Sequence, residues 1–284
     1  MTPLPDLLGV TATLLGTGTS TGVPIIGCRC AVCTSADPRD ARTRTSAHVV
    51  AHTSLGDVHI QIDAGPDFRV QALREGITAV DALVVTHHHF DHVVGLDDLR
   101  PFFFSNRAPA PVWALPASGT VLREMFGYVF DRAYAGSSLL DLHETDGRTP
   151  FVVRARGVAP GEPVAAVRVT PVVGRHGRVD VMGVRIGGFA YLTDVKTVPD
   201  ETVAALRGVD VLVLDGLRPE SHPTHLSFQE AADVAARVGA AETWFVHMTH
   251  AVTHAAGDAL LPPGVRLGYD GLTLEAGAPP PSEP

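Results

Sequence analysis

Short apolar runs alternate with stretches of turn-forming residues along the whole chain. Runs in which every second residue is apolar, and continuously apolar runs of similar length, predict β-strands. Such runs cover residues 11–15, 58–63, 82–86, 112–115, 167–173, 189–194, 209–215 and 243–247. The pattern therefore predicts a protein built on many short strands.

Helical patterns separate several of these runs. The clearest covers residues 228–238, where apolar residues recur on one face, Ser227 and Glu230 have the spacing of a capping box, and Gly239 can end the helix. Further helices are predicted at residues 66–74 and 118–126. Strands interspersed with helices, without an internal repeat, predict a layered α/β fold.

No break in composition divides the chain, so we expect one domain over residues 1–275. Residues 133–161 are rich in Gly, Asp and Arg and are expected to form an excursion or flap. The Pro-rich residues 276–284 are expected to form a disordered tail.

The composition is that of a globular protein, with 45% hydrophobic and 19% charged residues among 284. No apolar run reaches the ~18 residues of a membrane helix, and no basic residue precedes the first short apolar stretch, so we expect a cytoplasmic protein without membrane contact. The formal charge of −9 argues against nucleic acid as a partner but leaves a small anionic substrate open. A homodimer is compatible with the sequence.

Four metal-ligand side chains crowd the loop that follows the apolar run 82–86, namely His87, His89, Asp91 and His92. Alternation along the chain places His87 and His89 on one side of this loop, where two imidazoles can share a metal ion. Four such groups are too many to bury by packing alone. His88 faces the opposite way and is predicted not to be a ligand.

All three cysteines of the chain lie together as Cys28, Cys30 and Cys33 in a Gly-flanked loop. This spacing suits a structural zinc ion better than a disulfide framework. Because zinc in such a site takes four ligands, a fourth must come from elsewhere. We expect His250 in that role, with His254 as the alternative.

The His-x-His-x-Asp-His pattern resembles that of the metallo-β-lactamase superfamily. The resemblance implies an α/β fold of the four-layer αββα sandwich type with a dinuclear metal site at one edge. It implies that one metal is held by His87, His89 and His176, the other by Asp91, His92 and His247, and that Asp194 bridges them. Asp63 matches the first acidic motif of the superfamily and is expected to support the metal-binding loop by hydrogen bonds.

Imidazole and carboxylate ligands suit two divalent ions of Zn or Mn, and also Fe. Two such ions, about 3.5–4 Å apart, can activate a bridging water and stabilise an in-line displacement, most naturally at phosphorus. His225 is expected to donate a proton to the leaving group, and Asp91 is assigned to catalysis as well as to metal binding. Arg175 and Arg178 flank His176 and are candidate substrate contacts, and Arg218 is a weaker one.

The Cys loop, the seven-ligand set, His225, the early Gly16-Thr17-Gly18 and the late Gly268-Tyr269-Asp270-Gly271 together resemble the PhnP-type phosphodiesterases. This family includes phosphoribosyl 1,2-cyclic phosphate phosphodiesterases, so the resemblance implies a small, cyclic phosphodiester as substrate. Three alternatives stay open. They are a tRNA 3′-processing nuclease, a PqqB-like protein of cofactor biosynthesis, and a module in which metal only organises a surface.

Overall fold

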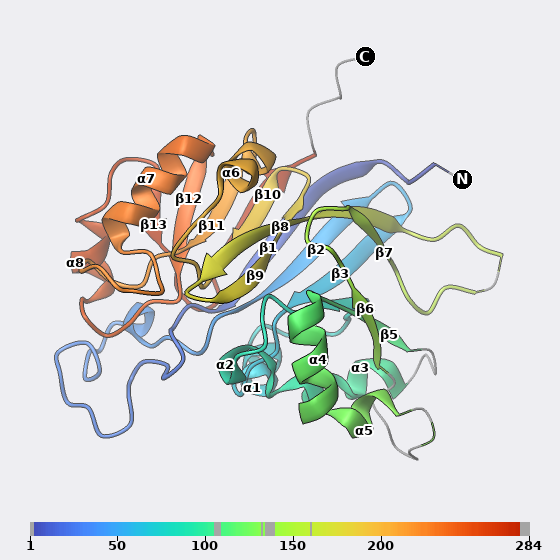
Figure 1. Cartoon of the computed structure of the whole chain (residues 1–284), viewed down its shortest axis with the longest axis horizontal. Coiled ribbons are helices and arrows are strands. Elements are labelled where there is room, and N and C mark those ends of the chain that lie inside the picture. Colours follow the sequence, from blue (N-terminus) through green and yellow to red (C-terminus); the bar gives the residue numbers. More distant parts are fainter. Residues whose placement is uncertain (1–2, 105–108, 132, 134–139, 160, 279–284) are drawn as a thin grey trace.

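The computed structural model describes residues 3–104, 109–131, 133, 140–159 and 161–278. Within these residues, two seven-stranded sheets pack face to face and helices cover their outer faces (Figure 1). Sheet 1 has the strand order β14-β1-β2-β3-β4-β5-β6, and sheet 2 has the order β13-β12-β11-β10-β9-β8-β7. The predicted αββα sandwich is therefore confirmed.

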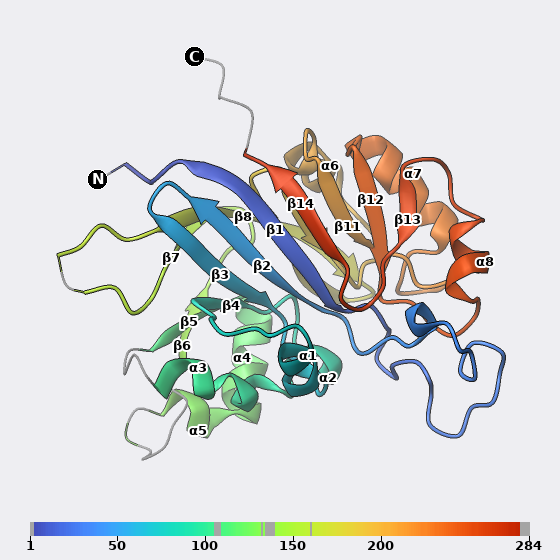
Figure 2. The ribbon, with the colours of Figure 1, turned by 180° about the vertical axis from the view of Figure 1, so that it is seen from behind.

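Sheet 1 is built mainly from the N-terminal half of the chain and closed by the last strand. Its strands are β1 (Leu7–Gly16), β2 (Ser46–Thr53), β3 (Gly56–Ile62), β4 (Ala82–Val84), β5 (Ala110–Ala114), β6 (Leu140–Glu144) and β14 (Thr273–Gly277). The helices α1 to α5 lie beside β4, β5 and β6 (Figures 1 and 2). They are α1 (Phe68–Arg74), α2 (Phe90–Val93), α3 (Pro101–Phe104), α4 (Pro116–Met125) and α5 (Gly127–Phe130).

Sheet 2 is built from the C-terminal half. Its strands are β7 (Phe151–Arg154), β8 (Ala166–His176), β9 (Val179–Ile186), β10 (Phe189–Leu192), β11 (Val211–Asp215), β12 (Glu242–Val246) and β13 (Val265–Leu267). Its outer face carries α6 (Asp200–Leu206), α7 (Phe228–Val238) and α8 (His254–Asp258) (Figure 1).

The hydrophobic core has three layers, one between the sheets and one beneath each group of helices. Strand β1 shows why the sequence folds this way. Its residues Val10, Ala12 and Leu14 are buried between the sheets, whereas Thr11 and Thr13 lie half-buried on the outer face. Successive side chains of a strand point to opposite faces, so the apolar alternation assigns one face to the core.

All eight predicted strands and all three predicted helices are present, with boundaries shifted by a few residues. The capping box of α7 is formed, because the Ser227 hydroxyl accepts from the Glu230 N–H and the Glu230 carboxylate accepts from the Ser227 N–H. Gly239 ends the helix with a left-handed φ of 71°. The sequence pattern missed strands β2, β6, β7, β9, β13 and β14.

Two expectations about segments were wrong where the structure describes them. Within 133–161, β6 pairs with β5 and β7 pairs with β8, so these residues complete the two sheets instead of leaving the fold as a flap. Within 276–284, Ala276 and Gly277 belong to β14, where they pair with Val10 and Gly9. Pairing with a neighbouring strand gives the backbone N–H and C=O groups of these segments their hydrogen-bond partners. The polar composition of the segments does not reveal this pairing. Residues 134–139, 160 and 279–284 of these segments lie outside the described residues.

No helix in the described part of the chain is long and apolar enough to cross a membrane.

Candidate metal centre

The polar residues that follow the parallel strands gather at one edge of the sandwich. In sheet 1, β3 and β4 run parallel, and in sheet 2 β10, β11 and β12 run parallel. Asp63 follows β3, Asp194 follows β10 after one residue, Asp215 ends β11 and His247 follows β12. Because the carboxyl ends of parallel strands point to the same edge of a sheet, these side chains approach one another.

Three of these residues have an unusual backbone. Among the described residues, the non-glycine residues with left-handed φ are Asp63 (56°), Asp194 (56°) and His247 (63°). L-residues rarely adopt this conformation, and it is retained where the surrounding structure demands it, often at functional sites.

The expected metal ligands meet at this edge. His247 Nε2 lies 3.0 Å from Asp194 Oδ1 and 3.6 Å from Asp91 Oδ2. His92 Nε2 lies 3.4 Å from Asp194 Oδ2 and 3.3 Å from Asp91 Oδ2. His87 Nε2 lies 4.0 Å from Asp194 Oδ1. Asp194 is thus within reach of both expected ligand groups, as its expected bridging position requires.

The two remaining ligands complete the group on the His87 side. The ring of His89 lies 4.5 Å from that of His87 and 5.1 Å from that of His176, between centroids. His176 Nδ1 donates to the backbone oxygen of Thr224 at 2.9 Å, which leaves Nε2 as the free nitrogen of that ring. The structure therefore brings together all seven side chains that the resemblance selected.

Several ring nitrogens at this centre have no hydrogen-bond partner although they are buried, namely Nε2 of His87, His92 and His247. Buried polar atoms without a partner are rare and need an explanation. Imidazole nitrogens that converge with carboxylate oxygens are a donor set for Zn, Mn or Fe. The residues present therefore fit divalent metal ions.

The electrostatics of the centre agree with this donor set. Burial lowers the pKa of His87 well below its usual value. Burial also acts on His92 and His247, but the Asp194 carboxylate outweighs it and raises the pKa of both, that of His247 to about 10. Burial raises the pKa of Asp194, yet His247 and His92 outweigh it and hold that pKa well below its usual range. Positive charge at the rings compensates the buried carboxylates, as a bound cation would.

Asp63 bonds to one of the expected ligands. Its Oδ2 accepts from His92 Nδ1 at 2.7 Å and from the Thr86 hydroxyl at 2.7 Å, and its Oδ1 accepts from the Thr86 N–H at 2.8 Å. These bonds fix the His92 ring so that Nε2 faces the other ligands.

His225 lies beside the ligands on the sheet 2 side. Its ring is stacked 4.7 Å from that of His247 and lies 4.4 Å from that of His176. Its Nδ1 donates at 3.0 Å to Oδ2 of Asp215, a fully buried carboxylate that also accepts from the Val195 N–H. The contact leaves His225 Nε2 as the functional nitrogen.

The sequence analysis did not single out Asp215. The signal was present, because Asp215 ends the apolar run 209–215 in the same way as Asp63 ends the run 58–63 and Asp194 ends the run 189–194.

The cysteine loop closes on His250 and not on the alternative residue. The Sγ atoms of Cys28, Cys30 and Cys33 lie 3.4, 3.4 and 3.3 Å from His250 Nδ1. The backbone N–H of Cys33 lowers the pKa of Cys30 to about 6, which favours the thiolate that zinc requires. The His254 ring instead packs near that of Tyr269, and the backbone N–H of His254 donates to Asp40 Oδ1.

The remaining candidates lie around the centre. His88 Nδ1 contacts Ser118 Oγ at 3.2 Å, and His88 is absent from the ligand clusters found among the described residues. Arg175 and Arg178 are exposed on the hairpin between β8 and β9, and Arg175 pairs with Asp180 at 3.3 Å. Neither arginine is shown in contact with the clustered ligands.

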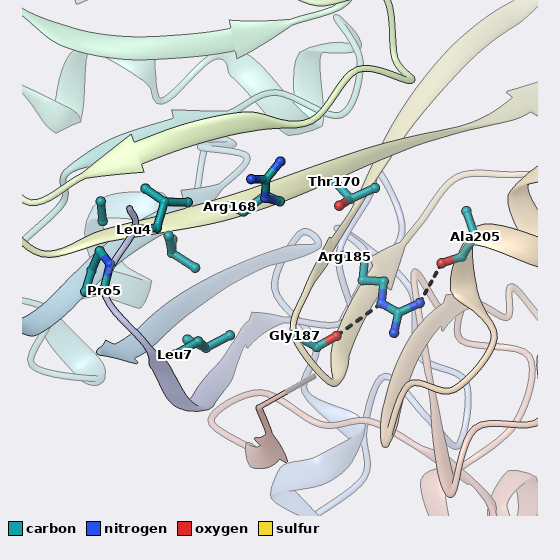
Figure 3. Close-up of a pocket in the computed structure, with 10 residues that line it drawn as sticks. Leu4, Pro5, Leu7, Arg168, Thr170, Arg185, Gly187 and Ala205 are labelled. Atoms are coloured by element: carbon teal, nitrogen blue, oxygen red, sulfur yellow. Dashed lines mark hydrogen bonds between the residues drawn. The ribbon is translucent and has the colours of Figure 1, made fainter. Parts of the chain in front are cut away.

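A cavity of about 400 Å³ lies elsewhere, between the N-terminal segment, β8, β9 and α6 (Figure 3). Arg168 and Arg185 line it with apolar residues that include Leu4 and Pro5. Arg185 donates to the backbone oxygens of Gly187 and Ala205 (Figure 3). The lining residues of this cavity do not include the expected ligands.

Residues 59–248 match the model of the beta-lactamase superfamily domain. An octanoyltransferase of Porphyromonas gingivalis is 40% identical over 262 residues, which are 91% of this chain and 50% of that protein. The chain thus spans about half the length of this relative.

Two solved structures are similar along almost the whole chain. A structure described as a new diphosphatase from the PhnP family has a TM-score of 0.82 and 39% identity, and the match covers 96% of this chain and 99% of that one. Zinc-bound PqqB from Methylobacterium extorquens has a TM-score of 0.69 and 20% identity, covering 93% and 99%, and shows the shared fold. The chain belongs to the metallo-β-lactamase superfamily, in which it is similar to the PhnP family.

Proposed function

We propose that this chain is a dinuclear-metal hydrolase that cleaves a small phosphodiester, with cyclic diesters such as phosphoribosyl 1,2-cyclic phosphate as first candidates. The superfamily match and the PhnP-family neighbour support a hydrolase. The observation that carries the finer proposal is the Asp215–His225 pair beside the clustered ligands, because an imidazole held there can donate a proton to the leaving group of a phosphate ester.

One metal would be held by His87, His89 and His176, the other by Asp91, His92 and His247, and Asp194 would be shared. When bound, two divalent ions would supply an activated water at neutral pH and stabilise negative charge on the phosphate oxygens. The protein residues do the rest.

His225 donates a proton from Nε2 to the departing oxygen. Asp215 accepts the Nδ1–H of that ring and holds it so that Nε2 is the nitrogen left for the substrate. Asp63 holds His92 in the orientation that metal binding needs.

A diphosphate is the second candidate substrate, because the PhnP-family neighbour is described as a diphosphatase. The octanoyltransferase name belongs to a protein of about twice this length. The side chains gathered at the centre are metal donors together with the Asp215–His225 pair, which favours hydrolysis as the activity of this chain.

The test is hydrolysis of bis-p-nitrophenyl phosphate by the protein loaded with Mn or Zn. We expect Asp194→Ala to abolish turnover, because both metal sites lose a ligand. His225→Ala should lower kcat by about 100-fold, the usual share of a general acid. Metal content, measured by mass spectrometry, should stay at the wild-type value in His225→Ala and fall in Asp194→Ala.

Full turnover by Asp194→Ala would refute the dinuclear mechanism. Loss of metal from His225→Ala would make that residue a ligand instead of an acid. Cleavage of a precursor tRNA in place of small diesters would favour the nuclease alternative.

A further inference from the structure

The connection between β11 and α7 is a compact loop that carries three basic side chains. Leu217 N–H donates to the Leu226 oxygen at 3.0 Å, and Phe228 N–H donates to the Arg218 oxygen at 2.9 Å, so the ends of the loop are held together. Arg218, His222 and His225 lie on this one loop. His225 is already assigned to the reaction, and the other two are not.

His222 stands next to His225 and is the more exposed of the two rings. Its ring centroid lies 5.2 Å from that of His225, whose ring in turn stacks 4.7 Å from His247. Nδ1 of His222 accepts from the N–H of Thr224 at 3.3 Å and contacts its hydroxyl at 3.3 Å. A neutral imidazole with an accepting Nδ1 carries its proton on Nε2. His222 thus offers a donor in the row of rings that leads outward from the centre.

Arg218 has donors that the protein does not use. Its Nε is buried without a hydrogen-bond partner and lies 4.0 Å from the Glu220 carboxylate, and its Nη2 makes one long contact of 3.5 Å with the Ser221 oxygen. Ser221 directly precedes His222, so this contact places the guanidinium on the stretch of loop that carries the His222 ring. An under-used guanidinium beside a ring N–H is a donor set for a phosphate.

We propose that Arg218 and His222 form a subsite for a second phosphate group carried by the leaving group of the substrate. This inference rests on the proposed hydrolase function and narrows its substrate class. If His225 donates its proton to the departing oxygen, the leaving group lies next to His225. Arg218 and His222, which lie on the same loop, are then placed to contact that leaving group. The formal charge of −9 would repel a doubly phosphorylated substrate, and the positive charge of Arg218 offsets part of that repulsion.

A diphosphate diester is the simplest substrate of this class. The oxygen of water bonds to the phosphorus at the metal centre, and the bond from that phosphorus to the bridging oxygen breaks. The second phosphate keeps the electron pair of that bond and departs as a monoester, with a proton from His225. Water supplies both protons of the balance, so two phosphate monoesters form without any further reactant.

The test compares diadenosine diphosphate with bis-p-nitrophenyl phosphate, whose leaving group carries no phosphate. For Arg218→Ala and His222→Ala, we expect kcat/KM to fall about 10-fold more on the diphosphate than on the diester, as for the loss of a hydrogen bond to a charged group. Arg168→Ala is the matched control, because this arginine is exposed on the distant cavity of Figure 3. It should leave both activities unchanged.

Calorimetric binding of inorganic pyrophosphate to the metal-loaded protein gives a second readout that needs no turnover. Both variants should weaken pyrophosphate binding about 10-fold, with a smaller effect on orthophosphate. Equal losses on both substrates, or unchanged pyrophosphate binding, would overturn the subsite. If the wild type cleaves neither substrate, the proposed hydrolase function fails, while the pyrophosphate measurement still decides whether the subsite exists.

Discussion

At the scale of the residue, the centre depends on side chains held in unfavourable backbone conformations. Asp63, Asp194 and His247 each have a left-handed φ, which costs a non-glycine residue about 1–3 kcal/mol. Asp194 and His247 are expected metal ligands, and Asp63 bonds to the expected ligand His92. The fold therefore tolerates this conformational cost, and the three side chains lie at the same edge of the sandwich.

His48 is a second buried histidine with its own hydrogen-bond chain. Its Nδ1 contacts Gln61 Oε1 at 3.4 Å and its Nε2 contacts His59 Nδ1 at 3.2 Å. The Gln61 amide donates in turn to the Ser46 hydroxyl and to the backbone oxygen of Asp63. The chain thus connects a half-exposed histidine on β3 to the residue that orients His92.

This environment predicts a pH dependence of stability. Burial, followed by repulsion from His59, lowers the pKa of His48 to about 4. The unfolded chain takes up this proton near pH 6.5 and the folded chain only near pH 4, so stability falls as the pH drops through this range. The loss for one such proton is at most about 1.4 kcal/mol per pH unit. We expect His48→Gln to flatten the dependence measured by urea unfolding.

The control is His52→Gln on the same strand, because His52 is partly exposed and paired with Asp57. It should leave the slope between pH 6.5 and 4 as in the wild type. An unchanged slope in His48→Gln would show that burial does not suppress the charge of this ring.

At the scale of the element, loops fixed at both ends present the functional groups. The cysteines of the segment Cys28–Cys33 contact His250, and Arg42, further along the same connection between β1 and β2, contacts Thr249 and Val252. The fully buried Arg42 guanidinium donates to the Thr249 oxygen and contacts Asp40 Oδ1 at 3.3 Å. Thr249 lies two residues after His247, so these contacts hold the backbone that follows this expected metal ligand.

Replacing one thiolate tests the structural zinc. We expect Cys30→Ser to lose one zinc per chain and to lower Tm by several degrees, because a structural zinc contributes folding free energy. The activity per folded molecule at low temperature should stay within about threefold of wild type, because the loop supports the site without touching the reacting atoms. Metal analysis and scanning calorimetry are the measurements.

Arg29→Ala supplies the control, because this exposed side chain lies in the same loop between two of the cysteines. It should keep its zinc and its Tm. A Cys30→Ser protein with unchanged zinc content and heat stability would contradict the structural zinc site.

At the scale of the whole molecule, the centre joins the two halves of the sandwich. His87, His89, Asp91 and His92 come from the region around β4 and α2 beside sheet 1, whereas His176, Asp194 and His247 come from sheet 2. Metal ions held between them would cross-link the two sheets at their open edge. Metal binding should therefore stabilise the entire fold.

Chelation measures this coupling. Removing metal should lower Tm, and adding Zn or Mn back should restore it, since a ligand at 100 times its Kd stabilises a protein by about 2.7 kcal/mol. Asp194→Ala should show a much smaller shift on chelation. The Cys30→Ser background separates this effect from that of the cysteine site. A Tm that does not respond to metal in that background would count against a buried dinuclear centre.

The sequence predicted a large part of both fold and centre. Periodicity located eight strands and the helix 228–238 because each has a regular apolar face. It missed β6 and β7, which are short edge strands with a weak apolar pattern in a segment rich in Gly, Asp and Arg. The seven candidate ligands, which the structure brings together, were selected through an ordered set of residue types, whereas Asp215 and His222 carry no local signal of that strength.

The sequence by itself determined the alternation that makes two sheets and the chemical types at their edge, because these depend on local pattern. The tertiary structure alone decided between His250 and His254 at the cysteine loop, and it alone showed that Asp215 orients His225 and that Arg218 keeps unused donors. Each of these findings depends on how close two residues lie that belong to different elements or to opposite ends of a loop. Such distances depend on how the elements pack, and the packing is a property of the whole chain.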